Sequence, residues 1–411
     1  MTSFPFVRSS FEVPFAVEPI PGISTTVVSA SGDRCGSVAA HDRHGDPQHL
    51  TRSVEPAEPN LTVPHEARPR VLVVGDYRWP MYERAFCDAL RRVGAVVVEL
   101  PIWRFLGPGD LLRRAQTKYC VGPGIAAANA ALVAACALHK PHVVLAWRTP
   151  WLWPAAVKAA RRVGAGRVVL YNNDDPFGRD AELVIWRRFR RLIPVADVCL
   201  SYRRVNMAEY QAAGAKAVGL LRSYFEPALH RPLDLTDADR KRFETDVVFV
   251  GHCEPDDRLE MIDRLIESGL RLRLFGTSWE KHAQGHRWLD WLPIGDLRGD
   301  DYVRAIAAAR IALVFLSKRN RDDYTRRCFE IPAIGTLMLA PRTQELLSLY
   351  REDEEAAFFD TADGLVAQVR RYLADPQLRE RVATGGRARC LRDGYDVDSR
   401  ARQFLVDLGL R

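Results

Sequence analysis

The feature that most constrains the fold is an alternation of short apolar runs with helix-like segments, which starts near residue 70 and again near residue 246. Each series opens with an apolar run that ends in glycine, RVLVVG at 70–75 and DVVFVG at 246–251. Short, uninterrupted apolar runs between helices are typical of strands that are buried on both faces of a parallel sheet. The pattern therefore predicts an α/β protein with two Rossmann-like, doubly wound domains.

Each series contains several runs of this kind, separated by segments with helical periodicity. The first series has six predicted strands, at residues 70–75, 95–100, 142–147, 167–171, 197–201 and 217–221. The second has five, at residues 246–251, 270–276, 311–316, directly after Gly335, and at 356–359. The predicted helices lie at about residues 82–93, 124–139, 152–163, 181–192, 258–268, 302–309, 363–374, 376–390 and 398–408.

Composition predicts the domain boundaries. Residues 1–67 are rich in Pro, Ser, Thr, Gly and His and lack periodicity, so we expect a poorly ordered extension. Two prolines in FEPALHRP, followed by polar residues, mark the break between the two series. We expect an N-terminal Rossmann-like domain at 68–228, a linker at 229–244 and a C-terminal Rossmann-like domain at 245–411. Ligands bind at the carboxyl ends of strands in open α/β sheets, which predicts a site in a cleft between the domains.

Charge and cysteine content exclude several classes of protein. The net charge is +7, but no block of like charges forms a tail, and aromatic residues do not interleave with a basic stripe, so nucleic acid is not an expected partner. The eight cysteines are scattered without a CxxC pair, which argues against zinc and favours buried thiols in a reducing compartment. No apolar window reaches the length of a transmembrane segment, and no signal peptide is apparent, so we expect a cytoplasmic protein without a metal or a cofactor.

The stretch YTRRCFEIPAIGTLMLA at 324–340 is the strongest candidate for a binding site. Arg326, Arg327 and Glu330 lie within about one and a half turns of a predicted helix start, where the exposed backbone N–H groups favour anions. A ligand with a diphosphate and sugar hydroxyls would suit these groups. The alternative is a salt-bridged helix surface with no ligand.

Other candidate residues follow predicted strands. Gly251 and the downstream Arg258 are placed to approach a phosphate, although a tight turn with an exposed arginine would look the same. Asp174 and Asp175 directly follow the strand at 167–171, so either is a candidate general base or sugar ligand, with a turn before Pro176 as the alternative. Asp76 follows the first strand at the same edge and is a candidate to contact an acceptor, although turns are common at this position.

Two pairs of aspartates have the Asp-x-Asp spacing of some metal sites. They lie at Asp237 and Asp239 and at Asp396 and Asp398. Both pairs sit in polar loops or at predicted helix starts, where aspartate commonly caps the helix. We therefore interpret them as solvated or capping residues, and not as metal ligands.

The motifs of the second half resemble those of GT-B fold glycosyltransferases, and among them the spore-maturation (CgeB-type) family with its glycosyl-transferase group 1 C-terminal domain. The resemblance rests on VFVG at 248–251 with Arg258, on Thr325-x-Arg327-x-Phe329-Glu330, on EEAAFFD at 354–360 and on YLADPQLR at 372–379. Asp174-Asp175-Pro176 is similar to the acidic-proline motif of that family. The resemblance covers residues 70–405 and is most specific over 246–395.

The resemblance implies transfer of a sugar, as in a hexosyltransferase, from a nucleotide-diphosphate sugar to a glycan, protein or small-molecule acceptor. It also implies that the domain at 245–411 binds the nucleotide sugar and that the domain at 68–228 binds the acceptor. Glu330 would hold the donor ribose, and Arg327 and Arg258 would neutralise the diphosphate without a metal. Asp322, eight positions before Glu330, stands where related enzymes carry a glutamate that contacts the donor hexose. A catalytically silent nucleotide-sugar-binding or scaffold protein of the same fold is the alternative.

Overall fold

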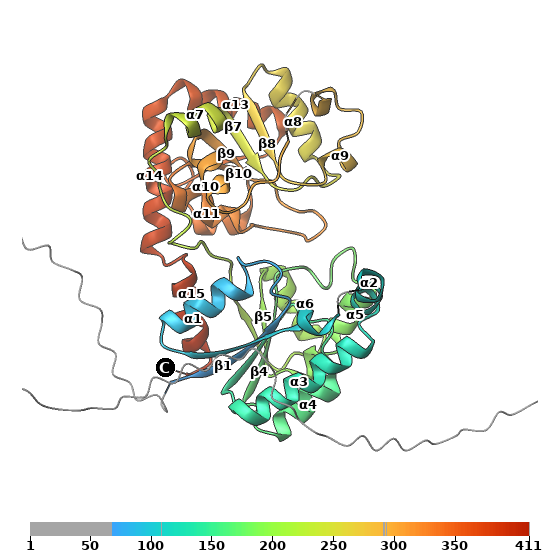
Figure 1. The fold of residues 1–411 in the computed structure, drawn as a ribbon. Coiled ribbons are helices and arrows are strands. Elements are labelled where there is room, and N and C mark those ends of the chain that lie inside the picture. Colours follow the sequence, from blue (N-terminus) through green and yellow to red (C-terminus); the bar gives the residue numbers. More distant parts are fainter. Residues whose placement is uncertain (1–67, 108, 291, 293, 411) are drawn as a thin grey trace, which may run out of the picture. The chain divides into compact units, whose positions relative to one another are not determined.

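The computed structural model describes residues 68–107, 109–290, 292 and 294–410 of the 411-residue chain (Figure 1). The predicted N-terminal extension, residues 1–67, lies outside the described residues. The described chain contains two parallel sheets, each surrounded by helices, which confirms the predicted pair of Rossmann-like domains.

The N-terminal domain is built on a six-stranded sheet. Its strands are β1 (Arg70–Gly75), β2 (Val96–Pro101), β3 (Val143–Trp147), β4 (Arg167–Asn172), β5 (Val198–Ser201) and β6 (Val218–Leu220). They lie in the order β2-β1-β3-β4-β5-β6, and every pairing between neighbours is parallel. All six correspond to the predicted runs within a residue or two.

The C-terminal domain repeats this arrangement with five strands. They are β7 (Thr245–Val250), β8 (Leu272–Phe275), β9 (Ala309–Leu313), β10 (Leu337–Pro341) and β11 (Ala357–Phe359). Their order is β11-β10-β9-β7-β8, and their pairings are parallel as well. In each sheet the first strand lies between the second and the third. The order therefore reverses beside β1 and beside β7, which is where open α/β sheets bind ligands.

Helices connect the strands in both domains. In the N-terminal domain they are α1 (Glu83–Arg92), η2 (Ile102–Phe105), α2 (Asp110–Tyr119), α3 (Pro123–His139), α4 (Pro154–Arg162), α5 (Val184–Arg190), η3 (Ile193–Val195) and α6 (Arg204–Ala212). In the C-terminal half they are α7 (Asp237–Phe243), α8 (Arg258–Glu267), α9 (Trp279–His282), η4 (Arg287–Asp290), α10 (Gly299–Ala307), α11 (Arg327–Ile334), α12 (Gln344–Leu349), α13 (Ala362–Ala374), α14 (Pro376–Arg392) and α15 (Val397–Asp407).

Both faces of each sheet are buried, as the uninterrupted apolar runs predict. In β1, Val71 and Val73 pack into one apolar cluster while Leu72 and Val74 pack into another on the opposite face. The strand β1 therefore has no polar face, and the polar residues of this segment follow its carboxyl end. This concentrates the chemistry at the edges of the sheets.

The chain crosses between the domains twice. Residues 221–236 lead from β6 to α7, which occupies part of the predicted linker at 229–244. After α14 the chain returns, and α15 packs against α1 of the N-terminal domain. Phe404 of α15 meets Phe86 of α1 edge to face at 5.7 Å, and Arg92 forms an ion pair with Asp398 at 2.6 Å.

Within the described residues, no single helix has both the length and the apolar character needed to cross a membrane. Residues Leu111–Tyr119 and Pro123–His139 satisfy the criterion only when they are taken together, and they are bent by 62° where they meet.

Candidate active site

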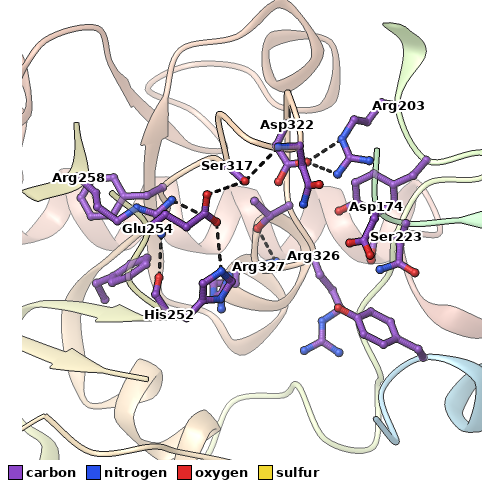
Figure 2. Close-up of a pocket in the computed structure, with 18 residues that line it drawn as sticks. Asp174, Arg203, Ser223, His252, Glu254, Arg258, Ser317, Asp322, Arg326 and Arg327 are labelled. Atoms are coloured by element: carbon purple, nitrogen blue, oxygen red, sulfur yellow. Dashed lines mark hydrogen bonds and ion pairs between the residues drawn. The ribbon is translucent and has the colours of Figure 1, made fainter. Parts of the chain in front are cut away.

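A pocket of about 230 Å³ lies at the carboxyl end of β7, next to the start of α11 (Figure 2). Residues of both domains line it. They are Tyr82, Asn173, Asp174, Tyr202, Arg203, Ser223, Phe249, Gly251, His252, Glu254, Arg258, Phe315, Ser317, Asn320, Asp322, Thr325, Arg326 and Arg327. Four arginines and three carboxylates thus surround one small space, which marks the pocket as a site for a polar, anionic ligand.

Two glycines shape the floor of the pocket. A Cβ atom on Gly251 would lie 2.7 Å from the Phe249 ring and 3.1 Å from Nη2 of Arg327. A Cβ atom on Gly276, where φ is +125°, would lie 2.1 Å from the carbonyl oxygen of Gly251. Only glycine fits at these strand ends, since any side chain would displace either the backbone or the Arg327 guanidinium.

Arg327 is the first residue of α11, and its guanidinium lies over the Phe249 ring at 6.0 Å. Its Nε is buried without a hydrogen-bond partner, and it forms no ion pair with any residue that the structure describes. Its backbone N–H is capped by the Thr325 hydroxyl at 3.2 Å. The charge of Arg327 is therefore not neutralised by any part of the chain that the structure describes.

Arg203 reaches the pocket from the end of β5 and binds Asp322 of the C-terminal domain. The guanidinium is 2% exposed and lies over the Tyr202 ring at 4.7 Å, while its Nη1 has no hydrogen-bond partner among the described residues. Burial raises the pKa of Asp322 to about 6, although Arg203 opposes this shift. The pair joins the two domains across one wall of the pocket.

Arg326 forms an ion pair with Glu330. Its Nε lies 2.8 Å from the Glu330 carboxylate, which also accepts a hydrogen bond from the Tyr302 hydroxyl at 2.5 Å and lies 3.5 Å from His230. Burial acts to raise the pKa of Glu330, but the charges of Arg326 and His230 outweigh it and leave the pKa lowered. Glu330 is fully buried and does not line the pocket. Its direct contacts orient Arg326, whose Nη1 has no partner in the described chain.

Arg258 lines the opposite wall at the start of α8. It binds Asp256 at 2.6 Å and donates to the His252 carbonyl at 2.8 Å. Glu254 lies between them and accepts hydrogen bonds from His252 at 3.1 Å and from Ser317 at 2.7 Å. Burial acts to raise the pKa of Glu254. These hydrogen bonds and the charge of Arg258 outweigh burial and lower the pKa to about 2. Glu254 therefore stays ionised and fixes this wall.

The two aspartates after β4 have different environments. Asp174 lines the pocket, and its carboxylate forms an ion pair with Arg148 at 2.6 Å. Asp175 points away from the pocket into a buried network, in which it binds Arg321 at 2.6 Å and accepts from Asn206 at 2.8 Å. Burial acts to raise the pKa of Asp175, but the hydrogen bonds from Arg321 outweigh burial and leave the pKa lowered. Of the two predicted catalytic carboxylates, the geometry brings Asp174 alone to the pocket.

Asp76 lies at the end of β1 and is buried. Both of its carboxylate oxygens accept hydrogen bonds from Arg78 at 2.6 Å, and its backbone N–H donates to the Glu83 carboxylate at 2.9 Å. Asp76 does not line the interdomain pocket. In this structure it therefore positions Arg78 on the N-terminal side.

Six of the nine site residues predicted from the sequence line the pocket. They are Asp174, Gly251, Arg258, Asp322, Arg326 and Arg327. Arg203 and Glu254 also line the pocket, and neither was predicted from the sequence. Arg203 lies two residues after the end of β5, as Asp174 does after β4, so the rule that found Asp174 would have found Arg203 too. Glu254 lies further along the loop after β7, where the rule is less specific. No group of three or more metal-ligating side chains occurs in the described part of the chain.

Comparisons with known proteins agree with this fold. Residues 258–406 match a protein-family model described as glycosyl transferase-like. Among curated proteins, none matches the chain. A solved sucrose-phosphate synthase from Thermosynechococcus elongatus is similar, with a TM-score of 0.60 at 14% identity over 82% of this chain and 97% of that chain.

Two further solved structures show the same likeness. HepE from Anabaena, solved in complex with UDP and glucose, gives a TM-score of 0.59 at 12% identity over 83% of this chain and 100% of its own. A glycosyltransferase from Rickettsia africae gives a TM-score of 0.60 at 11% identity over 83% and 98%. At these identities the likeness shows the fold, which is the GT-B arrangement of two Rossmann-like domains.

Proposed function

We propose that this protein is a glycosyltransferase that binds a nucleotide-diphosphate sugar in the interdomain pocket and transfers the sugar to an acceptor hydroxyl. One observation carries the proposal. Of the five arginine nitrogens that are buried without a hydrogen-bond partner in the described chain, three belong to pocket residues: Nη1 of Arg203, Nη1 of Arg326 and Nε of Arg327. Buried polar groups without a partner are rare in folded proteins, and a diphosphate supplies the acceptors that these groups lack.

The match of residues 258–406 to a glycosyl transferase-like model supports this reading of the pocket, as does the likeness to HepE solved with UDP and glucose. In the proposed reaction the bond between the sugar C1 and the diphosphate oxygen breaks, and a bond from C1 to the acceptor oxygen forms. Arg327 stabilises the negative charge that develops on the leaving diphosphate. Asp174 takes the proton of the acceptor hydroxyl, because it lines the pocket and Asp175, the other carboxylate predicted to be catalytic, does not.

The remaining details belong to the same proposal. We propose a hexosyl donor, neutralisation of the diphosphate by arginines without a metal ion, and membership of the CgeB-type subfamily, to which YLADPQLR at 372–379 is similar. A cytoplasmic location is supported by the seven cysteines of the described chain, which are all buried and free. The ribose contact of Glu330 stays a prediction. The buried position of Glu330 supports an indirect role through Arg326.

The proposal is tested by titrating UDP, GDP and ADP into the protein in a calorimeter, with and without EDTA. At least one nucleotide should bind, and EDTA should not change its affinity. Arg327→Ala should weaken that binding about 10- to 100-fold, because a charge-assisted hydrogen bond contributes about 1.5–3 kcal/mol. Arg370→Ala is the matched control, since Arg370 is exposed on α13 of the same domain and lies outside the pocket.

Two outcomes would contradict the proposal: no nucleotide binds the unmodified protein, or Arg327→Ala binds it as tightly as Arg370→Ala does. The silent-binder alternative needs a second assay. Asp174→Asn should retain nucleotide affinity yet lose release of UDP from UDP-glucose. If the unmodified protein binds nucleotides but releases no diphosphate from any nucleotide sugar with any acceptor, it is a binding protein and not a transferase.

A further inference from the structure

A second hollow of about 640 Å³ lies in the N-terminal domain, beside the carboxyl ends of β1 and β2. Its lining shares no residue with the interdomain pocket. The lining residues are Arg78, Trp103, Arg104, Leu106, Gly107, Arg113, Arg114 and Thr117. Four of these eight residues are arginines and none is acidic, whereas three carboxylates line the interdomain pocket.

The first wall of the hollow is the turn of η2 that follows β2. Ile102 anchors this turn in the core at 1% exposure, while Trp103 remains 46% exposed. The guanidinium of Arg104 lies 6.0 Å from the centre of the Trp103 ring. An indole face and a cation are thus presented together at the rim, and neither is used by the core of the domain.

The second wall is α2, and a buried glutamine fixes it against the first. Gln116 of α2 is 3% exposed; it donates to the Leu106 carbonyl at 3.2 Å and accepts from the Gly124 N–H at 2.7 Å. A Cβ atom on Gly124 would lie 2.2 Å from the Phe105 carbonyl oxygen, so this close approach requires glycine. The shape of the hollow is therefore built into the packing of η2, α2 and α3.

The arginines of the hollow differ in the partners that they have. Asp76 holds Arg78 in place through two hydrogen bonds of 2.6 Å. Arg104 and Arg114 form no ion pair with any residue that the structure describes. Clustered cations repel one another, and an anionic group between them relieves this repulsion and accepts their N–H groups.

We propose that this hollow binds an anionic group, a phosphate or a carboxylate, of the acceptor substrate, with the adjoining ring of the acceptor against Trp103. The inference rests on the proposed transferase function and names the class of acceptor. One loop connects the two sites, because Arg78 lines the hollow and Tyr82 lines the interdomain pocket. Four residues span at most about 14 Å, so one acceptor molecule can reach from the hollow to the pocket.

An anionic membrane surface would also be attracted to this face, because Leu111 and Leu112 of α2 are 85% and 54% exposed. These leucines do not line the hollow, whereas the arginines do. A concave, cation-lined space with a pinned wall fits a small anion better than a flat bilayer. The membrane is therefore an outcome that the experiment must distinguish from the proposal.

The test uses phenyl phosphate, which combines a phosphate with a ring, and phenol as its neutral counterpart. Calorimetry should show binding of phenyl phosphate to the full chain and about tenfold or weaker binding of phenol. The double variant Arg104→Gln/Arg114→Gln should weaken phenyl phosphate binding about tenfold or more and leave UDP affinity unchanged. Arg162→Gln, on an exposed position of α4 away from both sites, is the matched control. Arg327→Ala should leave phenyl phosphate binding unchanged.

The proposal is overturned if phenyl phosphate fails to bind, if the double variant binds it normally, or if Arg327→Ala abolishes the binding, since the probe would then occupy the donor pocket. It is also overturned if the chain sediments with phosphatidylglycerol vesicles through Leu111 and Leu112, as shown by glutamine variants of both, while phenyl phosphate does not bind. If phenyl phosphate binds in the hollow but no nucleotide binds the protein, the acceptor role is lost together with the proposed function, and an anion site unconnected with sugar transfer remains.

Discussion

The two domains place a glycine at the same topological position and surround it with opposite charges. Gly75 ends β1 and Gly251 follows β7, and both stand where the strand order of their sheet reverses. A Cβ atom on Gly75 would lie 2.6 Å from the side chain of Glu83, whereas a Cβ atom on Gly251 would approach the guanidinium of Arg327. In the N-terminal domain the space is filled by a carboxylate of the chain itself. In the C-terminal domain it is bordered by a cation without an ion-pair partner in the described chain.

The carboxylates near these two glycines also differ in their electrostatics. Glu83 is 3% exposed, and burial raises its pKa, although backbone N–H groups act against this shift. Burial also acts on Glu254, but its hydrogen bonds and Arg258 lower its pKa to about 2. The same strand-loop-helix unit thus holds the buried carboxyl Glu83 in the N-terminal domain. In the C-terminal domain it holds Glu254 in a network with Arg258. Topology selects where a ligand can bind, and the neighbouring side chains decide which charge it carries.

Alanine at each glycine should give the largest effect. Gly251→Ala and Gly75→Ala should both destabilise the protein by about 1–3 kcal/mol, because the new methyl group overlaps packed side chains. Only Gly251→Ala should also weaken UDP binding, by about tenfold, because it displaces Arg327. Urea unfolding and calorimetry measure the two effects. Equal loss of UDP affinity in both variants would remove the functional difference between the two positions.

Removing the charge of Glu254 should give an intermediate effect. A carboxyl with a lowered pKa stabilises the fold above its ordinary pKa, and this contribution disappears as the pH falls through about 2. Glu254→Gln should therefore cost about 1–2 kcal/mol at pH 7, after allowance for its partial exposure to solvent. The difference from the unmodified protein should shrink in urea unfolding experiments at acid pH. A difference that stays constant with pH would show that the lost stability comes from packing instead.

Removing the charge of Glu83 should give the smallest effect, and in the opposite direction. A raised carboxyl pKa means that the stabilising contribution is complete below the ordinary pKa and is lost as the pH rises through the folded value. At pH 7 Glu83→Gln should therefore be as stable as the unmodified protein or more stable by less than about 1 kcal/mol, since the amide oxygen can still accept from the Asp76 N–H. As the pH falls, the unmodified protein should gain stability relative to Glu83→Gln, because Glu83 becomes protonated. A clear loss at pH 7 would mean that the Glu83 charge is compensated after all.

Much of the fold could be predicted because local patterns determine it. Every predicted strand occurs, since apolar runs bounded by glycine and polar residues have few alternatives to burial in a parallel sheet. The interpretation of the Asp-x-Asp pairs as caps is confirmed as well. Asp239 completes a capping box with Thr236, and Asp396 accepts from the Ser399 N–H at 2.8 Å. Helix α2 was not predicted, because its exposed Leu111 and Leu112 obscure the pattern of a helix with one buried face.

The site was predictable in position but not in detail. Arg326 and Glu330 are four residues apart on one helix face, which predicts their contact. Glu330 is fully buried beside Tyr302 and His230. These two residues come from distant segments, so the sequence around Glu330 does not predict the contacts. The same holds for Asp322 and Arg203, whose contact spans 119 residues of the chain. Such partners are set by the way the domains pack, which periodicity does not encode.

The packing of α15 against α1 affects the order in which the two domains fold. Phe86 of α1 packs against Phe404, a residue near the end of the chain. A nascent N-terminal domain therefore cannot cover this face of α1 with its native partner until α15, which follows all strands of the C-terminal sheet, has been synthesised. Until then α1 exposes apolar surface that would otherwise be buried. The N-terminal domain, although it is synthesised first, should be the last to finish folding.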